Sequence, residues 1–168
     1  MLKKIALVLL CALPFTLMAQ EVKLGHVNSQ EILTLMPERT TIEKTLSDLQ
    51  SQWEKEAVKM REEYVAKVEE FQEKQATMPE SIKQARQSEI ADIEQRITTL
   101  NQTAQTDIQK KQQELFNPVI EKVKKAINEV GTENGYLYIF DLSTQSIVFQ
   151  SAKSNDVTPL VKKKLGLK

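Results

Sequence analysis

The sequence predicts a mostly α-helical chain with a small β body, from which a long antiparallel helical hairpin projects as a coiled-coil arm. Residues 38–76 and 80–116 contain neither glycine nor proline, so each segment can form one uninterrupted helix. Short apolar runs that are typical of strands occur before and after these two segments. Charged residues make up 27% of the chain and aromatic residues 5%, which suits solvated helices better than the core of a compact enzyme.

Residues 1–19 are typical of a secretory signal peptide. Two lysines precede an almost entirely apolar run that ends at Ala19, where polar residues begin. The alternative is a retained membrane anchor, but the run is shorter than the roughly 20 residues that a spanning helix needs. Cys11 is the only cysteine and lies in this run, so the mature chain would have no disulfide, thiolate nucleophile or Cys-based metal site. We therefore expect an exported protein.

The segment before the hairpin predicts one strand and one short helix. Residues 22–27 carry three apolar side chains in a strand-like run. Residues 29–36 follow as a short helix with Ser29 as its N-cap. Pro37 then opens the first helix of the hairpin, because a proline is tolerated in the first turn of a helix.

Both halves of the hairpin carry an apolar stripe. In residues 38–76 the apolar or large side chains recur every three or four positions, and the spacing repeats every 11 residues. This period corresponds to about 3.67 residues per turn, so the stripe follows a nearly straight helix. At a rise of about 1.5 Å per residue, the helix is a rod of roughly 58 Å. Residues 77–79 interrupt this helix, and residues 80–116 carry a similar stripe in a second one.

The two stripes match when the chain folds back at residues 78–79. The residue numbers of six facing pairs then add up to 157, as for Tyr64 with Ile93 and Trp53 with Ala104. Two unrelated helices are not expected to share one register, so the stripes predict a packed seam. The predicted seam residues are Ile42, Leu49, Trp53, Ala57, Met60, Tyr64, Val68, Ile90, Ile93, Ile97, Leu100, Ala104, Ile108 and Leu115.

The C-terminal third predicts the rest of the body. The Asn-Pro pair at 117–118 predicts the start of a separate amphipathic helix, which the Asn-Gly pair at 134–135 ends. The apolar runs 136–140 and 147–149 predict two strands, and residues 158–166 a short final helix.

The predicted domains are a body, made of residues 20–37 and 117–168, and a hairpin of residues 38–116. Three short strands with one covering helix form a sheet that is marginal alone and has unpaired edges. The nearly continuous apolar run 136–140 indicates a strand that is buried on both faces. Association of several chains would close the sheet and cover its edges, although the residues do not fix the number of subunits.

Two stretches of the body resemble the Skp/OmpH family of periplasmic chaperones. They are GHVNSQEILTLMPE at residues 25–38 and LFNPVIEKVKKAINEVGTENGYLYIFDLS at residues 115–143, and a closing strand, SIVFQ, follows. The resemblance covers essentially the whole mature chain. It implies a homotrimer whose strands form a central β-barrel, with three hairpins projecting as tentacles around a cavity. It also implies that unfolded outer-membrane proteins are held there, in the periplasm, without ATP.

The charge of the hairpin departs from the better-known members of this family, whose basic tentacles support contact with anionic lipopolysaccharide. Residues 38–77 hold seven basic and ten acidic side chains, and residues 80–116 hold five and six. Positive charge is concentrated in residues 117–168, which hold eight basic and five acidic side chains. This distribution argues against contact of the hairpin with lipopolysaccharide or a membrane surface. Nothing in the balance favours nucleic acid as a partner.

Client binding requires apolar surface outside the seam. Val58 and Val65 lie beside the main stripe of the first helix, and Ala76, Met78 and Ile82 lie at or near the turn. Methionine and small apolar groups suit weak, adaptable contacts with many unfolded chains. The alternative is that these side chains widen the seam or contact a neighbouring subunit.

The sequence offers no constellation that predicts an enzyme or a cofactor. His26 is the only histidine, which favours a structural role over a metal or catalytic one. Asp141, beside Ser143, is expected to make hydrogen bonds within a turn. The three lysines at 162–164 either complement the dipole of the final helix or touch an anionic surface. The alternative function is a structural or adaptor coiled-coil protein of the cell envelope, which would have the same architecture.

Overall fold

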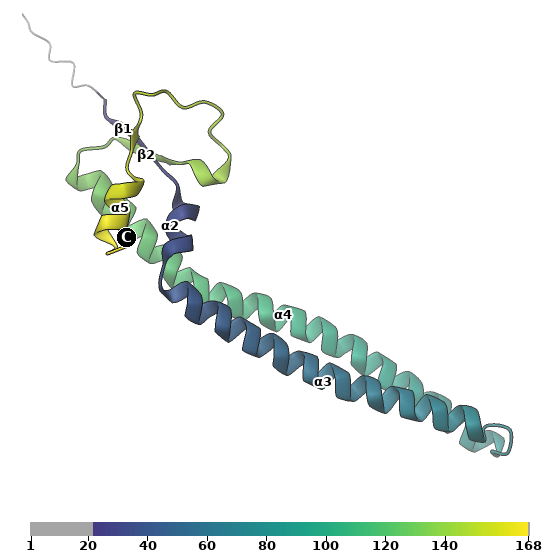
Figure 1. The fold of residues 1–168 in the computed structure, drawn as a ribbon. Helices are drawn as coiled ribbons and strands as arrows, with labels where there is room; N and C mark the ends of the chain where they lie inside the picture. Colours follow the sequence, from purple (N-terminus) through teal and green to yellow (C-terminus); the bar gives the residue numbers. More distant parts are fainter. Residues whose placement is uncertain (1–21, 168) are drawn as a thin grey trace, which may run out of the picture.

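The computed structural model describes residues 22–167 (Figure 1). The predicted signal peptide, residues 1–19 with Cys11, lies outside the described residues. The chain is mostly helical, with one long helix pair and a small three-stranded sheet, which confirms the predicted fold class at this level. The elements are β1 (Leu24–Val27), α2 (Ser29–Leu35), α3 (Glu38–Lys74), α4 (Glu80–Glu133), β2 (Tyr138–Asp141), the 3-10 helix η1 (Leu142–Thr144), β3 (Asn155–Asp156) and α5 (Thr158–Lys164).

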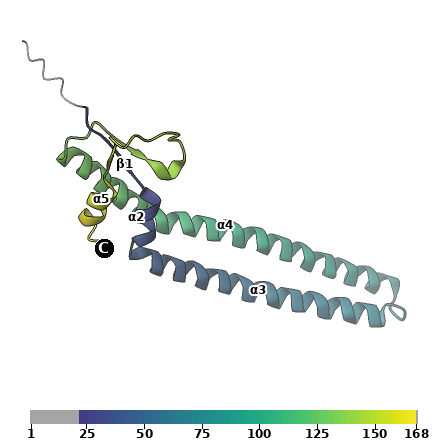
Figure 2. The ribbon, with the colours of Figure 1, turned by 45° about the horizontal axis from the view of Figure 1, so that its top comes forward.

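Helix α3 and the first part of α4 form an antiparallel hairpin that projects away from the body (Figures 1 and 2). The two helices contact each other along this length. Polar contacts fix their pairing: Trp53 Nε1 donates to Asp107 Oδ2 at 3.1 Å, and Lys67 Nζ lies 2.6 Å from Glu89 Oε1. Prolines precede both helices, Pro37 before α3 and Pro79 before α4, as the sequence predicts.

Helix α4 differs from the prediction, because it does not break at Asn117 and Pro118 but continues through both to Glu133. A proline inside a helix removes one N–H donor and costs about 3 kcal/mol. The residues after it outweigh that cost, since Val119, Val123 and other apolar side chains of the same face are buried in the body. One helix therefore serves both the hairpin and the body.

The sheet has the order β2-β1-β3, and both pairs are parallel. Leu24 pairs with Tyr138 and His26 with Asp156, so the central strand, from the N-terminal part of the chain, pairs with two segments of the C-terminal part. The predicted strand at 147–149 is wrong. These residues have strand-like side chains, but residues 155–156 occupy the free edge of β1 through backbone pairing, which side-chain polarity does not reveal.

The remaining boundaries follow from local hydrogen bonds. Asn28, rather than the predicted Ser29, caps α2, since its side chain accepts from the backbone N–H of Glu31 at 3.1 Å. Gly135 has a φ of 67° and follows the end of α4, as predicted. Strand β2 begins at Tyr138 rather than at residue 136, because the N–H of Tyr136 donates to the carbonyl of Gly131 at the helix end.

One face of the sheet packs against the helices of the body. Gly25 and Val27 of β1 are buried on this face, and a side chain at Gly25 would lie 3.1 Å from the ring of Tyr136. Helix α5 contacts both α2 and α4. The buried body core consists of Val27, Ile32, Met36, Ile42, Val119, Val123, Ala126, Val130, Val157 and Val161. On the opposite face of the sheet, Leu24, Tyr138 and Phe140 are exposed, which leaves this face open to other contacts.

Candidate functional site

The predicted client-binding residues lie in two separate places on the hairpin. Val58 and Val65 lie on the same side of α3, with exposed fractions of 42% and 50%. Ala76 and Ile82 are exposed at the far end of the hairpin, where Met78 is half-buried. The structure therefore separates a flank of α3 from a tip, and the five residues do not form one continuous site.

The flank of α3 carries two shallow hollows that share Val58. The first hollow is lined by Val58 together with polar and charged side chains. The second is lined in part by Val58, Val65 and the methyl group of Ala66. Both basic and acidic side chains border the two hollows, for example Lys55, Arg61 and Glu62. Small apolar spots with mixed charges at their rims suit brief contact with many extended chains rather than one fixed ligand.

The fourteen predicted seam residues are all half-buried or buried in the structure. Ile42, Ala57 and Ile93 are buried, with exposed fractions of 6% or less, and the other eleven are half-buried. None of them is exposed, as we expect of side chains that pack α3 against α4. The apolar surface that remains on the hairpin is the flank of α3 and the tip.

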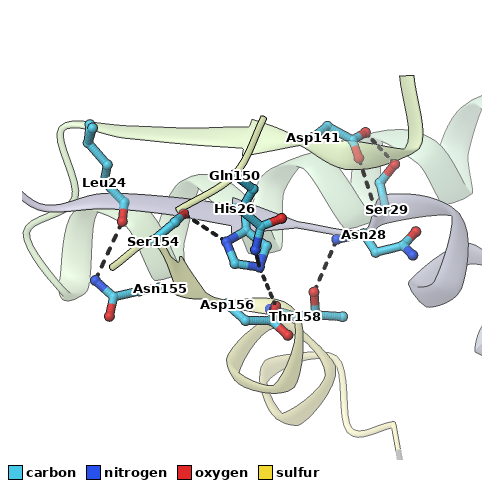
Figure 3. A network of polar contacts seen from close by, with 10 residues as sticks. All are labelled: Leu24, His26, Asn28, Ser29, Asp141, Gln150, Ser154, Asn155, Asp156 and Thr158. Atoms are coloured by element: carbon cyan, nitrogen blue, oxygen red, sulfur yellow. Dashed lines mark hydrogen bonds and ion pairs between the residues drawn. The ribbon is translucent and has the colours of Figure 1, made fainter. Parts of the chain in front are cut away.

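A polar network holds the open side of the body together (Figure 3). Asp141 Oδ2 accepts from Ser29 Oγ at 2.5 Å, and its Oδ1 accepts from the backbone N–H groups of Ser29 and Ser143 at 3.2 and 3.0 Å. Burial would raise the pKa of Asp141, but these hydrogen bonds outweigh it and hold the pKa below its ordinary value. The carboxylate therefore joins α2 to the end of β2, beyond the turn contacts that the sequence predicts.

His26 forms the second part of this network. The ring is 8% exposed, with Nδ1 2.8 Å from Ser154 Oγ and Nε2 3.0 Å from Gln150 Nε2. Asp156 Oδ1 lies 4.0 Å from Nε2. Among residues 22–167, no group of three or more His, Cys, Asp and Glu side chains could hold a metal ion. The contacts of His26 fit the structural role that its isolation in the sequence favours.

The body also carries an apolar surface that sequence reasoning missed. Leu24, Tyr138 and Phe140 lie on the open face of the sheet, with exposed fractions of 39%, 60% and 42%, and the two rings stack at 5.9 Å. A hollow of about 1030 Å³ lies between this face and the loop that carries Phe149. The expectation that the strand in residues 136–140 is buried on both faces is therefore wrong for the single chain, because only the face with Ile139 packs against the body.

Comparison with known proteins identifies the family. A model described as outer membrane protein (OmpH-like) matches residues 23–165, which span both parts of the body and the whole hairpin. The chain belongs to the OmpH-like family. It is also similar to a curated OmpH-like relative named chaperone protein Skp from Pectobacterium atrosepticum, with 23% identity over 143 residues and 85% of each chain covered. The resemblance seen in the two body segments is thus confirmed.

Membership of this non-enzymatic family confirms the prediction that the chain is not an enzyme. Within the described part of the chain, no helix is both long enough and apolar enough to span a membrane.

Proposed function

We propose that this OmpH-like protein is an ATP-independent periplasmic holdase, which binds unfolded outer-membrane β-barrel proteins and prevents their aggregation. The observation that carries the proposal is the family match over residues 23–165, which includes the hairpin as well as the more specific body. The signal peptide expected at residues 1–19 supports the periplasmic location. The similarity to chaperone protein Skp covers 85% of the chain.

The client surface is the exposed apolar part of the hairpin. Val58, Val65, Ala76, Met78 and Ile82 lie outside the seam and carry no charge. Each can contribute only a fraction of the roughly 1.5–3 kcal/mol that full burial of an aliphatic side chain gives. Retention of a client then depends on many weak contacts along the hairpin, so clients without a common sequence can be held.

The active form is a homotrimer in which the small sheets of three chains close into a β-barrel. Both β2 and β3 have an edge that no other described strand covers, and β3 contains only two residues. The open face beside these edges exposes Leu24, Tyr138 and Phe140, which are groups that a protein normally buries. Edge-to-edge pairing of the sheets would give hydrogen-bond partners to the free backbone N–H and C=O groups and would cover these side chains. The body of residues 20–37 and 117–168 would then assemble, and the hairpin of residues 38–116 would surround the client.

The test measures aggregation of a urea-unfolded outer-membrane β-barrel protein after dilution, with and without the mature chain. Light scattering is followed without nucleotide, and light-scattering mass measurement after gel filtration gives the size of soluble complexes. We expect suppression at about one oligomer per client, and no binding to the same client once it has folded. An oligomeric chain that fails to suppress aggregation of several unrelated clients contradicts the holdase. Binding to one folded envelope protein would instead support an adaptor.

A further inference from the structure

The loop that follows η1 presents the most exposed apolar side chains of the body. Residues 145–154, here called the hoop, leave η1 and arch back to β3 (Figure 1). Val148 is 99% exposed and Phe149 81%. In the described chain, no backbone hydrogen bond joins the hoop to the sheet. An apolar loop of this kind needs a partner and also needs a contact that fixes its position.

Among residues 22–167, His26 is the one side chain of the sheet that hydrogen-bonds to the hoop. His26, in the central strand β1, contacts Gln150 through Nε2 and Ser154 through Nδ1. As the Gln150 amide is oriented, its N–H donates to Nε2, so the proton of the neutral ring lies on Nδ1 and is donated to Ser154 Oγ. The other side-chain hydrogen bonds of the hoop that the structure describes stay within it or reach the adjacent residue Thr144.

His26 is well placed to position the hoop because both its backbone and its ring are held by the body. Its strand is paired on both sides, its carbonyl accepts from the N–H of Val157 at 2.9 Å, and the ring is almost fully buried. Loss of the imidazole would free both Gln150 and Ser154. The apolar residues 147–149 would then sample many positions, and ordering them again opposes association.

We propose that His26 is the positioning residue that holds the hoop ready to join a second copy of this chain, so that self-assembly depends on this imidazole. The occupant is a second copy because the hoop lies beside the open sheet face, and the free β2 edge of one copy can pair with the free β3 edge of the next. The inference rests on the proposed assembly and adds the residue on which that assembly depends.

The experiment compares the wild type with His26→Leu, which keeps bulk but loses both hydrogen bonds, and with His26→Gln, which keeps a donor and an acceptor. Gln150→Ala removes one contact from the exposed side, where folding is not at risk. Thr158→Val is the matched control, since Thr158 is 5% exposed and its Oγ1 accepts from the Asn28 N–H at 3.0 Å, a contact that includes no residue of the hoop. Sedimentation velocity over a concentration series measures assembly, and hydrogen exchange of peptides that cover 145–154 measures hoop order.

We expect His26→Leu to raise the dissociation constant of the oligomer by about tenfold or more and to speed exchange in the hoop but not in α3. Gln150→Ala should show a smaller effect in the same direction, and His26→Gln should recover most of the assembly. Wild-type assembly in both His26→Leu and Gln150→Ala overturns the proposal, as does an equal loss in Thr158→Val. A wild type that stays monomeric removes the proposed trimer and the role of His26 with it. The aggregation assay on the same wild-type sample measures holdase activity separately, so that a failure of assembly can be told from a failure of the holdase.

Discussion

At the scale of single residues, Asp141 and His26 are the polar side chains of the body whose long-range contacts the sequence does not reveal. Asp141 ends a strand and precedes Ser143, and the sequence predicts hydrogen bonds within a turn for it. The structure shows that it also reaches Ser29, more than a hundred residues earlier. A carboxylate that accepts three hydrogen bonds from two distant segments holds them together more strongly when it is ionised.

Asp141→Asn should lower the free energy of unfolding by about 1–3 kcal/mol at neutral pH, because the amide replaces an ionised acceptor of hydrogen bonds. The pKa of Asp141 is depressed in the folded state. Its contribution is therefore fully present above the unfolded value of about 3.9 and is lost as the pH falls through the folded pKa. Urea unfolding at several pH values should show a difference between wild type and variant that shrinks below about pH 4. Glu121→Gln, on an exposed surface, is the control, and a pH-independent difference would contradict the assignment.

At the scale of elements, the hairpin and the strands differ in how well the sequence predicts them. The hairpin follows from spacing, because α3 and α4 carry their own apolar stripe and their helices form from local hydrogen bonds. The third strand does not, since β3 consists of Asn155 and Asp156, which are poor strand formers that pair with β1 through the backbone and through the Asn155 side chain, whose Nδ2 donates to the Leu24 carbonyl. The same limit applies to Pro118, where tertiary burial overrides a local helix breaker.

The position of the proposed client surface could be predicted only in part. Sequence spacing separates Val58 and Val65 from the seam, since helical periodicity fixes the face on which each residue lies. It could not show that Met78 is half-buried, or that the open sheet face adds a second apolar surface, because both depend on contacts between distant segments.

The seam is the stabilising contact of the hairpin, so Ile93→Ala should cost about 2–4 kcal/mol, whereas Ile82→Ala should cost well under about 1 kcal/mol. Ile93 is 2% exposed and Ile82 47%. Both variants replace the same side chain in the same helix, so helix propensity changes equally. Urea unfolding followed by circular dichroism measures the difference. Equal losses would place Ile93 outside the seam.

Pro118→Ala should stabilise α4 by about 1–3 kcal/mol, because alanine restores the missing N–H donor and removes the steric conflict with the preceding turn. Thermal unfolding followed at the helical signal measures the gain. Pro159→Ala provides the comparison, since that proline lies in the first turn of α5 and displaces no helical hydrogen bond. A loss of stability in Pro118→Ala would show that the proline holds a bend that the body requires.

At the scale of the whole molecule, the body and the hairpin have different tasks. The body supplies edges and an open face for association, and the hairpin supplies exposed apolar groups beyond its seam. Helix α4 joins the two without interruption, so the hairpin takes its direction from the same helix that forms the body core. A defect in client contact and a defect in assembly can therefore be introduced separately.

The variant Val58→Ser, Val65→Ser, Ile82→Ser should weaken client binding by about tenfold while leaving the oligomer unchanged, because three partial apolar burials are lost. The aggregation assay described above measures the loss, and sedimentation checks the assembly. The matched control changes the exposed Gln52, Gln72 and Gln87 to serine, with two positions in α3 and one in α4. Unchanged protection in the apolar variant would remove these residues from the client surface.

The parallel pairing of β1 with β2 and β3 also decides the order of folding. Residues of β1 pair with partners well over a hundred positions later, whereas the hairpin closes from a short turn. Loop closure over that distance is slow, so the hairpin should form early and the sheet last. A chain that is delivered from its N-terminus can pair β1 with β2 first and must keep the other edge of β1 free until residues 155–156 arrive. The strand that covers this second edge is thus the later of the two partners to be delivered.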